Sequence, residues 1–383
     1  MIEQPSPSNR PGISRFFARG NPALLEIIRG LIRRDGKITF ADFMDLALYH
    51  PDFGYYNSAR ERFGKQGDFF TGPETHPVFG ALIACQLEQM WQSLDRPRSF
   101  AVVEMGAGAG ALCRDVLTYA RSSYPALFSA ISYKLVESSA VSVQRQRALL
   151  RASHLPLRSI RWYPSLSLLP RRPIVGCFLS NELVDAFPFH RVINDRGEIK
   201  EIYVGLAGDE LVDVVDRPST PAIVDHFQWV GTDLPIGCQA EVNLRSVDWI
   251  REVGRRLQRG FVLTIDYGYP AADLYSSVRP RGTLLCYYKH SYLEDPYVRV
   301  GQQDITAHID FTALARAGEE EGLAPISLTS QRDFLISLGL PAFVSELKQK
   351  GLGAAEYRAN FLALEELANP NGLGRLKVLL QSK

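Results

Sequence analysis

The segment that most constrains the fold of this chain is VVEMGAGAG, at residues 102–110. An apolar run that ends in an acid and passes into Gly-x-Gly-x-Gly predicts a buried strand followed by a glycine-rich turn. Glycine adopts positive φ without strain and has no Cβ, so such a turn brings backbone N–H groups and the next helix start close to a polar ligand. The sequence therefore predicts a nucleotide-like cofactor at this turn.

The spacing of the glycines separates two classes of cofactor. A dinucleotide site has G-x-G-x-x-G, in which the third glycine permits close helix packing. This chain has Gly106, Gly108 and Gly110 instead, with Glu104 two residues before the first glycine. The pattern resembles the first motif of class I S-adenosylmethionine (SAM) methyltransferases, which implies that the turn receives the amino-acid end of SAM. A tight strand-to-helix turn without a ligand is the alternative.

A second acid, Glu137, ends the short apolar run YKLVE, about one βαβ unit downstream. In nucleotide-binding α/β folds, an acid at the tip of the second strand accepts hydrogen bonds from the ribose hydroxyls. Glu137 is therefore predicted to bind the ribose, with a solvated charge at a strand end as the alternative. Leu112, Val116 and Leu117 have helical spacing and predict the crossover helix that parallel strands require.

Strands and helices alternate from residue 100 onward, which predicts an α/β fold with a doubly wound sheet. Ligands in such sheets bind at the carboxyl ends of the strands, where the strand order reverses. Alternating Val and Ile residues with turns at 195–197 and 208–209 predict a small antiparallel β insertion at about 190–240. The predicted parallel strands are residues 100–105, 133–137, 160–163, 174–180 and 260–266, and a closing strand is expected near 326–329 in an otherwise helical tail.

The first hundred residues are expected to be accessory. Residues 1–20 are rich in Pro, Ser, Asn and Arg and predict a flexible tail, and residues 21–99 predict a helical cap with a cofactor-covering loop. The aromatic side chains of Tyr55 and Tyr56 are costly to leave in water, so this loop is expected to pack over the cofactor edge or to anchor the cap. Residues 100–383 then carry the main domain.

Composition excludes several functional classes. Lys and Arg number 43 against 42 Asp and Glu, so no overall charge excess indicates a nucleic-acid or membrane partner. The five cysteines are scattered without a C-x-x-C pair, which indicates reduced thiols rather than a zinc or disulfide framework. No apolar run reaches the roughly 20 residues of a membrane span, and the N-terminus lacks the apolar core of a secretory signal. A cytoplasmic location is expected, or the mitochondrial matrix in a eukaryote.

The fourth predicted strand leads into the candidate chemistry. Asn181, Glu182 and Asp185 follow it directly, on the same carboxyl edge as the glycine turn. If the chain becomes helical there, Glu182 and Asp185 share a face. Two carboxylates can bind a guanidinium in bidentate fashion, or one can act as general base for an alcohol or amine. A helix start with solvated acids is the structural alternative.

The last third adds further candidates. The string IDYG at residues 265–268 places Asp266 and Tyr267 at the same edge, where Asp266 either reaches the substrate or caps the following turn. His290 and His308 lack the tight spacing of metal ligands, so no metal is expected. His308 is predicted instead to form the wall beneath the acceptor pocket.

At the level of whole motifs, the chain resembles the MidA family of SAM-dependent methyltransferases. The resemblance covers residue 38 to the C-terminus through these strings, in order: ITFADFMDLALYHPDFGYY, GKQGDFFTGPETHPVFG, VVEMGAGAG, SNELVDAFP, FVLTIDYG, GTLLCYYKH and GQQDITAHIDF. It implies a Rossmann-like class I fold and SAM as cofactor. The mitochondrial members act as complex I assembly factors and methylate arginine on a partner subunit, which implies a protein arginine as acceptor here.

The resemblance also implies roles for individual residues. Gly106, Gly108, Gly110 and Glu137 would contact the cofactor, Gly67, Asp68 and Thr71 would close over it, and Asn181, Glu182 and Asp185 would line the methyl-acceptor side. From their positions in the sequence, Glu104 is also expected at the cofactor, and Tyr55, Tyr267, His290 and His308 are expected to line the substrate. The family commonly has Pro and Arg where this chain has Ala107 and Ala109, and a more basic sequence at Leu285 and Cys286. These departures imply that the choice of acceptor differs from that of the mitochondrial relatives. Methylation of a small molecule at oxygen or nitrogen is the alternative within enzymes, and a SAM-binding assembly chaperone with little turnover is the alternative outside them. Oligomeric state stays open.

Overall fold

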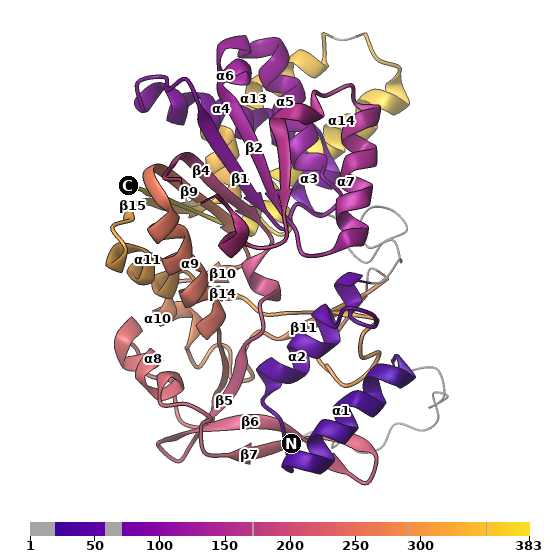
Figure 1. Cartoon of the computed structure of the whole chain (residues 1–383), viewed down its shortest axis with the longest axis vertical. Coiled ribbons are helices and arrows are strands. Elements are labelled where there is room, and N and C mark those ends of the chain that lie inside the picture. Colours follow the sequence, from indigo (N-terminus) through magenta and orange to yellow (C-terminus); the bar gives the residue numbers. More distant parts are fainter. Residues whose placement is uncertain (1–19, 58–70, 171, 290, 350) are drawn as a thin grey trace, which may run out of the picture.

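The computed structural model describes residues 20–57, 71–170, 172–289, 291–349 and 351–383. Its centre is a seven-stranded sheet of order β15-β16-β9-β4-β1-β2-β3, seen in the upper half of Figure 1. The five strands predicted as parallel are parallel to one another, which confirms the doubly wound sheet. They are β1 (Phe100–Met105), β2 (Ile131–Val136), β3 (Ile160–Tyr163), β4 (Ile174–Asn181) and β9 (Leu257–Asp266). The order reverses between β1 and β4, where such sheets bind ligands.

The sheet ends in two strands rather than in the one closing strand expected. Strand β15 (Ala324–Ser330) forms the edge, and β16 (Lys377–Ser382) lies between β15 and β9, antiparallel to both. The expectation of a helical tail missed β16. Its six residues are too few to show a period, and their strand conformation depends on hydrogen bonds from a strand on each side.

Helices cover both faces of this sheet. All six side chains of β1 are buried, and alternate residues enter two different cores. Phe100 and Val102 pack in the core under α4 (Val78–Ser93), α5 (Ala111–Ser123), α13 (Leu340–Leu347) and α14 (Ala354–Leu367). Ala101 and Val103 pack in the core under α8 (Ala222–Val230), α9 (Leu244–Arg256) and α11 (Phe311–Glu320). The carboxyl edge of the sheet stays open between these layers.

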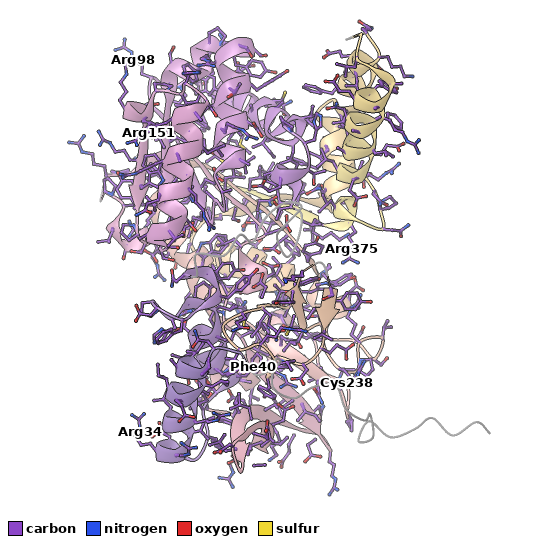
Figure 2. All side chains as sticks on the ribbon, turned by 90° about the vertical axis from the view of Figure 1, so that its right-hand side faces the viewer. Arg34, Phe40, Arg98, Arg151, Cys238 and Arg375 are labelled. Carbon is purple, nitrogen blue, oxygen red and sulfur yellow. The ribbon has the colours of Figure 1, made fainter. Side chains whose placement is uncertain are left out.

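A second sheet and the N-terminal helices form the lower half of Figure 1. The predicted antiparallel strands are present as β5 (His190–Asp195), β6 (Glu198–Ala207) and β7 (Glu210–Asp216), with β8 (Gln239–Val242) completing the order β7-β6-β5-β8. Helices α1 (Pro22–Asp35) and α2 (Phe40–Tyr49) pack on this sheet through a third core. The ring of Phe40, labelled in Figure 2, stacks on Phe189 at 5.4 Å. The N-terminal helices thereby hold the chain that leaves β4.

Two further observations bear on composition. All five cysteines are free, and four of them are buried, as the sequence predicts. No helix in the described part of the chain is long and apolar enough to cross a membrane. Of the predicted tail at residues 1–20, only Gly20 belongs to the described residues, where it forms a bridge with Val300.

Candidate active site

The glycine-rich turn connects β1 to α5 as predicted. Gly106, Gly108 and Gly110 have φ angles of 66°, 52° and 90°, a region in which residues with a Cβ are strained. A Cβ at Gly106 would lie 2.7 Å from Cδ1 of Leu183, in the segment that follows β4. Glycine is therefore favoured at residue 106 by its backbone conformation, and a larger residue would also have to displace the side chain of Leu183.

Beside this turn lies a cavity of about 680 Å³, within the size range of cofactor and substrate sites. Each parallel strand contributes the residues that follow its carboxyl end. The contributions are Gly106–Gly108 after β1, Glu137 and Ser138 after β2, Pro164–Leu166 after β3, Glu182, Leu183 and Asp185–Pro188 after β4, and Tyr267 after β9. The cavity thus lies where a doubly wound sheet binds its ligand.

The walls of the cavity are strongly acidic. Among the described residues that line it are eight carboxyl side chains and one arginine, Arg245, which is itself paired with Asp45 at 2.6 Å. The eight are Glu74, Glu104, Glu137, Glu182, Asp185, Asp248, Glu252 and Asp304. Such walls attract cations and repel anions, so a cationic ligand fits this site better than a phosphate-bearing one.

Glu137 is held in place by a residue that sequence analysis missed. Its Oε1 accepts a hydrogen bond from the N–H of Ser139 at 2.9 Å, and its Oε2 accepts one from Nε2 of Gln146 at 3.2 Å. Gln146 is fully buried; its Nε2 also donates to the carbonyl of Gly108 at 3.0 Å, and its Oε1 accepts from Nε1 of Trp162. Gln146 therefore ties the glycine turn to Glu137. The sequence did contain one signal for this role. Ser142, Gln146 and Leu150 are spaced four residues apart and share the buried face of α7 (Ala140–Ala152), where a glutamine needs hydrogen-bond partners.

Glu104 lies deeper, at the end of β1. Its side chain is 2% exposed, and its Oε2 accepts a hydrogen bond from the Tyr133 hydroxyl at 2.5 Å. Burial raises its pKa to about 7, against the opposing effect of this hydrogen bond. Glu104 is therefore poised to ionise when a cation enters the cavity.

At the other end of the cavity the chain does not become helical after β4. Glu182 has a φ of 49°, and only the short 3-10 turn Val184–Ala186 follows, so the expected shared helix face is wrong. The cause is Asp266, whose Oδ2 accepts hydrogen bonds from the N–H groups of Leu183, Val184 and Asp185 at 2.9–3.4 Å. Asp266 is fully buried and caps the turn that follows β4, rather than only the turn that follows Asp266 itself, where its Oδ1 accepts from the N–H of Tyr267 at 2.8 Å.

The turn nevertheless places two carboxyl groups in the cavity wall. Burial, followed by the charge of Asp266, raises the pKa of Glu182 to about 8 and that of Asp185 well above its usual range. No cationic side chain among the described residues forms an ion pair with either of them. Asp304 adds a third carboxyl group nearby and accepts hydrogen bonds from the Tyr56 hydroxyl at 2.9 and 3.0 Å. The burial of Glu182 and Asp185 is costly without a cation, and a bound cation stabilises them.

Comparison with known proteins decides the family. A family model described as "putative S-adenosyl-L-methionine-dependent methyltransferase" matches residues 82–329. The chain belongs to the MidA family of SAM-dependent methyltransferases. It is 28% identical to a Drosophila melanogaster protein named "Protein arginine methyltransferase NDUFAF7 homolog, mitochondrial", over 82% of this chain and 74% of that one. It is 27% identical to the Homo sapiens protein named "Protein arginine methyltransferase NDUFAF7, mitochondrial", over 94% of this chain and 85% of that one.

Solved structures agree with this membership. A Burkholderia thailandensis crystal structure bound to S-adenosyl-homocysteine superposes with a TM-score of 0.84 at 29% identity, covering 94% of this chain and 92% of that one. A native crystal structure from the same organism superposes with a TM-score of 0.82 at 30% identity, covering 94% of this chain and 91% of that one. This MidA chain is therefore a SAM-dependent methyltransferase, with the class I fold expected from its sequence.

The cavity of this MidA chain fits SAM. Gly106 and Gly108 line the cavity without a Cβ, and Glu137 lies at the tip of β2, where a ribose is bound in related folds. The buried Oδ1 of Asn181 has no hydrogen-bond partner among the described residues and can accept from a ligand. The acidic walls match the positive charges of a sulfonium and an amino group. Pro164 and Leu166 supply apolar surface for a base.

The other predicted site residues of the MidA chain divide into three groups. Thr71, Tyr267 and His308 line the cavity together with the residues above. Tyr55 and Gly110 do not line the cavity. Tyr55 is buried in the third core, and its neighbour Tyr56 lines the cavity instead. Gly110 packs on Gln146 at the start of α5. Gly67, Asp68 and His290 lie outside the described residues. No group of three metal-ligating side chains occurs within the described part of the chain.

His308 lies in the wall of the cavity beside Tyr267, which also lines it, and near Tyr269. Its ring lies 6.2 Å from that of Tyr267 and 5.3 Å from that of Tyr269. Burial, with Arg375 and Arg279 nearby, lowers its pKa to about 4. The imidazole is therefore neutral near pH 7 and adds no positive charge to a site that accepts cations. Tyr49, Tyr56 and Tyr287, which the sequence analysis did not assign to the substrate, complete this aromatic wall.

Replacing Gln146 with leucine is expected to weaken SAM binding about tenfold. The substitution removes three hydrogen bonds, each contributing about 1 kcal/mol, and releases Glu137 from the glycine turn. Isothermal titration calorimetry with SAM measures the change. Gln144→Leu, an exposed position on the same helix, is the matched control and is expected to bind as the wild type does. Equal affinities in the two variants would contradict the positioning role.

Replacing Glu182 with glutamine is expected to stabilise the empty protein at alkaline pH. The pKa of this carboxyl rises from its ordinary 4.5 to about 8 on folding, so the folded state binds more protons between these values and stability falls as pH increases. Glutamine removes this loss. The melting temperature of the variant should exceed that of the wild type by about 2 °C or more at pH 8.5, and by less at pH 5. Differential scanning fluorimetry at both values tests this, and a pH-independent difference would contradict it.

Proposed function

We propose that this chain transfers the methyl group of SAM to an arginine side chain of a protein partner. The observation that carries the proposal is the carboxyl cluster of Glu182, Asp185 and Asp304 at the end of the cavity away from Glu137. A guanidinium is a planar cation with five N–H donors, and it pairs with carboxylates in bidentate geometry. The names of the fly and human relatives, both protein arginine methyltransferases, support the same acceptor.

The chemistry requires mainly positioning. When bound, SAM supplies an electrophilic methyl group on a sulfonium. Glu182 and Asp185 bind the guanidinium, fix its plane and favour electron density on the attacking nitrogen. Asp266 holds Asp185 by accepting a hydrogen bond from its N–H, and the N–H of Glu182 donates to the carbonyl of Ile265. The Tyr56 hydroxyl orients Asp304. Well-oriented reactants gain roughly 7 to 11 kcal/mol of barrier reduction, so no metal or covalent enzyme intermediate is needed.

A carboxylate of the cluster also receives the proton that leaves the guanidinium. The nitrogen that gains the methyl group must lose a proton to remain a normal guanidinium cation. Glu182, with a pKa of about 8, is close enough to neutrality to accept this proton and release it afterwards. The proposal places the reaction in the cytoplasm, or in the mitochondrial matrix if the chain is eukaryotic.

Activity is expected to rise with pH until Glu182 is ionised. Below pH 8 this carboxyl is mostly protonated in the free enzyme and cannot pair with the guanidinium. The value of kcat/KM for the acceptor should therefore increase about tenfold per pH unit well below 8 and level off above it. Steady-state rates between pH 6 and 9.5 measure the profile. In the Glu182→Gln variant, the rise of kcat/KM up to about pH 8 should disappear. A pH profile unchanged from that of the wild type would remove Glu182 from this role.

The proposed function is tested by labelling an extract whose acceptors are unmethylated. Extract from cells that lack this chain is incubated with the purified protein and SAM carrying a tritiated methyl group. Label in protein, recovered as methylarginine after acid hydrolysis, is the expected result. Label in the low-mass fraction would indicate a small-molecule acceptor. Calorimetric binding of SAM with no label anywhere would indicate an assembly chaperone.

A further inference from the structure

Positive charge is concentrated at one edge of the central sheet. From Ser138 to Asn181 the chain has seven arginines and not one Asp or Glu, although the overall content of 42 acids in 383 residues would place about five there. Four of these arginines are exposed on α7 or on and beside β3: Arg147, Arg151, Arg158 and Arg161. We call these four residues the arginine edge. Figure 2 shows Arg151 on the outside of the upper half of the molecule.

The arginine edge has no acidic counterpart within the described residues. None of its four side chains forms an ion pair there, whereas Arg33, Arg251 and Arg259, which are partly or largely exposed elsewhere, pair with Asp209, Glu320 and Asp95. Arg147 instead lies over the ring of Trp162, 4.8 Å from its centroid. The charge of this edge therefore stays available to a partner.

One pair at this edge is unfavourable in the isolated protein. Lys134 of β2 and Arg161 of β3 lie directly opposite each other in the parallel register. Burial lowers the pKa of Lys134, and the charge of Arg161 lowers it further. Like charges in opposed positions destabilise a sheet, so an anion bound beside them would relieve a cost that the fold otherwise bears.

The edge is also open to an extended segment. Strand β3 ends the sheet and pairs only with β2 among the described strands. The connection from β3 to β4 contains no α-helix in its described part, only the 3-10 turn Leu166–Leu168. An exposed strand edge can accept an added strand through its backbone N–H and C=O groups.

The arginine edge adjoins the cavity. Ser142 in the first turn of α7 lines the cavity, and Arg147 follows five residues later, about 7.5 Å farther along the helix axis. Pro164, directly after β3, also lines the cavity, three residues beyond Arg161. A bound polypeptide can therefore contact the arginine edge and reach toward the cavity mouth.

We propose that the arginine edge is a docking surface for an acidic, extended segment of the protein whose arginine enters the cavity. This deepens the proposed function and, for the role of that arginine, rests on it. The acidic cavity takes the cation of the partner and the basic edge takes its anions, so the two charges together fix the direction of binding. A nucleic acid would meet the carboxylates of the cavity beside the edge, which favours a protein.

The test compares two triple variants with the same change in charge. One carries Arg147→Glu, Arg151→Glu and Arg161→Glu, and the control carries Arg217→Glu, Arg332→Glu and Lys348→Glu at exposed positions outside the edge. The probe is a fluorescein-labelled peptide of about 16 residues with eight glutamates and one arginine. Anisotropy should show binding to the wild type and to the control, and at least tenfold weaker binding to the edge variant. A peptide with glutamines in place of the glutamates should bind at least tenfold more weakly than the probe.

Three measurements make the outcome decisive. Calorimetry with SAM should give equal affinity in all three proteins, which shows that the edge variant is folded. Equal peptide binding by the edge variant and the control would overturn the proposal, and so would tighter binding of a single-stranded RNA of the same length. Labelling of the extract separates the two proposals: if the wild type labels no protein while peptide binding still depends on the edge, the proposed function fails and the docking surface stands.

Discussion

Asparagine in place of Asp185 is expected to lower kcat/KM for the arginine acceptor by roughly 30-fold to several thousand-fold, while SAM binding stays within about threefold of the wild type. Removing one member of a buried charge pair costs about 2 to 5 kcal/mol. Asp185 lies in the wall of the cavity, and its backbone is fixed by Asp266, so an amide of the same shape changes the charge and little else. The initial rate of label transfer into extract protein gives the ratio.

Asp248 provides the matched control for this substitution. It is also a cavity-lining carboxylate, but it lies on α9 with a side chain that is 81% exposed, so water already screens its charge. Asp248→Asn is expected to reduce kcat/KM by less than about threefold. Similar losses in the two variants would mean that the overall acidity of the cavity, rather than the cluster, binds the acceptor. Unchanged turnover in Asp185→Asn would remove this residue from the chemistry.

Alanine in place of Gly106 is expected to weaken SAM binding by about 30-fold or more. At a φ of 66° a Cβ costs roughly 1 to 2 kcal/mol, and here it would also meet Leu183 at 2.7 Å. Relief of that contact moves the Leu183 side chain, which lines the cavity, and the strain at residue 106 acts on the glycine turn itself. Because both form the walls of the cavity, the substitution is expected to reduce cofactor affinity and turnover together. Calorimetry with SAM and with S-adenosyl-homocysteine measures the affinity.

Gly197 separates backbone strain from the effect on the cavity. It lies in the turn between β5 and β6 with a φ of 98°, and nothing lies within 4 Å of a Cβ placed there. Gly197→Ala and Gly106→Ala should lower the free energy of unfolding by comparable amounts in denaturant titrations. Only Gly106→Ala should lose affinity for SAM. Equal affinity in both variants would show that the turn does not receive the cofactor.

Much of the fold follows from local sequence patterns. β1 and β3 have the predicted bounds, and the crossover helix begins directly after Gly110, because buried parallel strands are apolar runs and glycine turns are conspicuous. The strand at 377–382 was missed because its pairing partners, β9 and β15, lie far away in the sequence. Such a strand is defined by its neighbours rather than by its own residues.

The site shows the same division. The acids at the strand ends were predicted because a parallel sheet brings every carboxyl end to one edge, whatever the details of the connections. The roles of Gln146, Tyr56 and Asp266 were not predicted in this way. Each acts across a gap in sequence, so no local pattern distinguishes Gln146 from a surface glutamine, or the buried Asp266 from a substrate contact.

The sequence by itself determined the sheet, the glycine turn and the acids that belong to it, since these depend on residue type and spacing along short segments. Only the tertiary structure decided which carboxyl groups meet in the cavity, that the segment after β4 is a capped 3-10 turn, and that the arginines of α7 and β3 share one edge. These features depend on hydrogen bonds and electrostatic interactions between segments that only folding brings together. The strength of those interactions depends on how deeply the side chains are buried, which the spacing of residues along the sequence does not reveal.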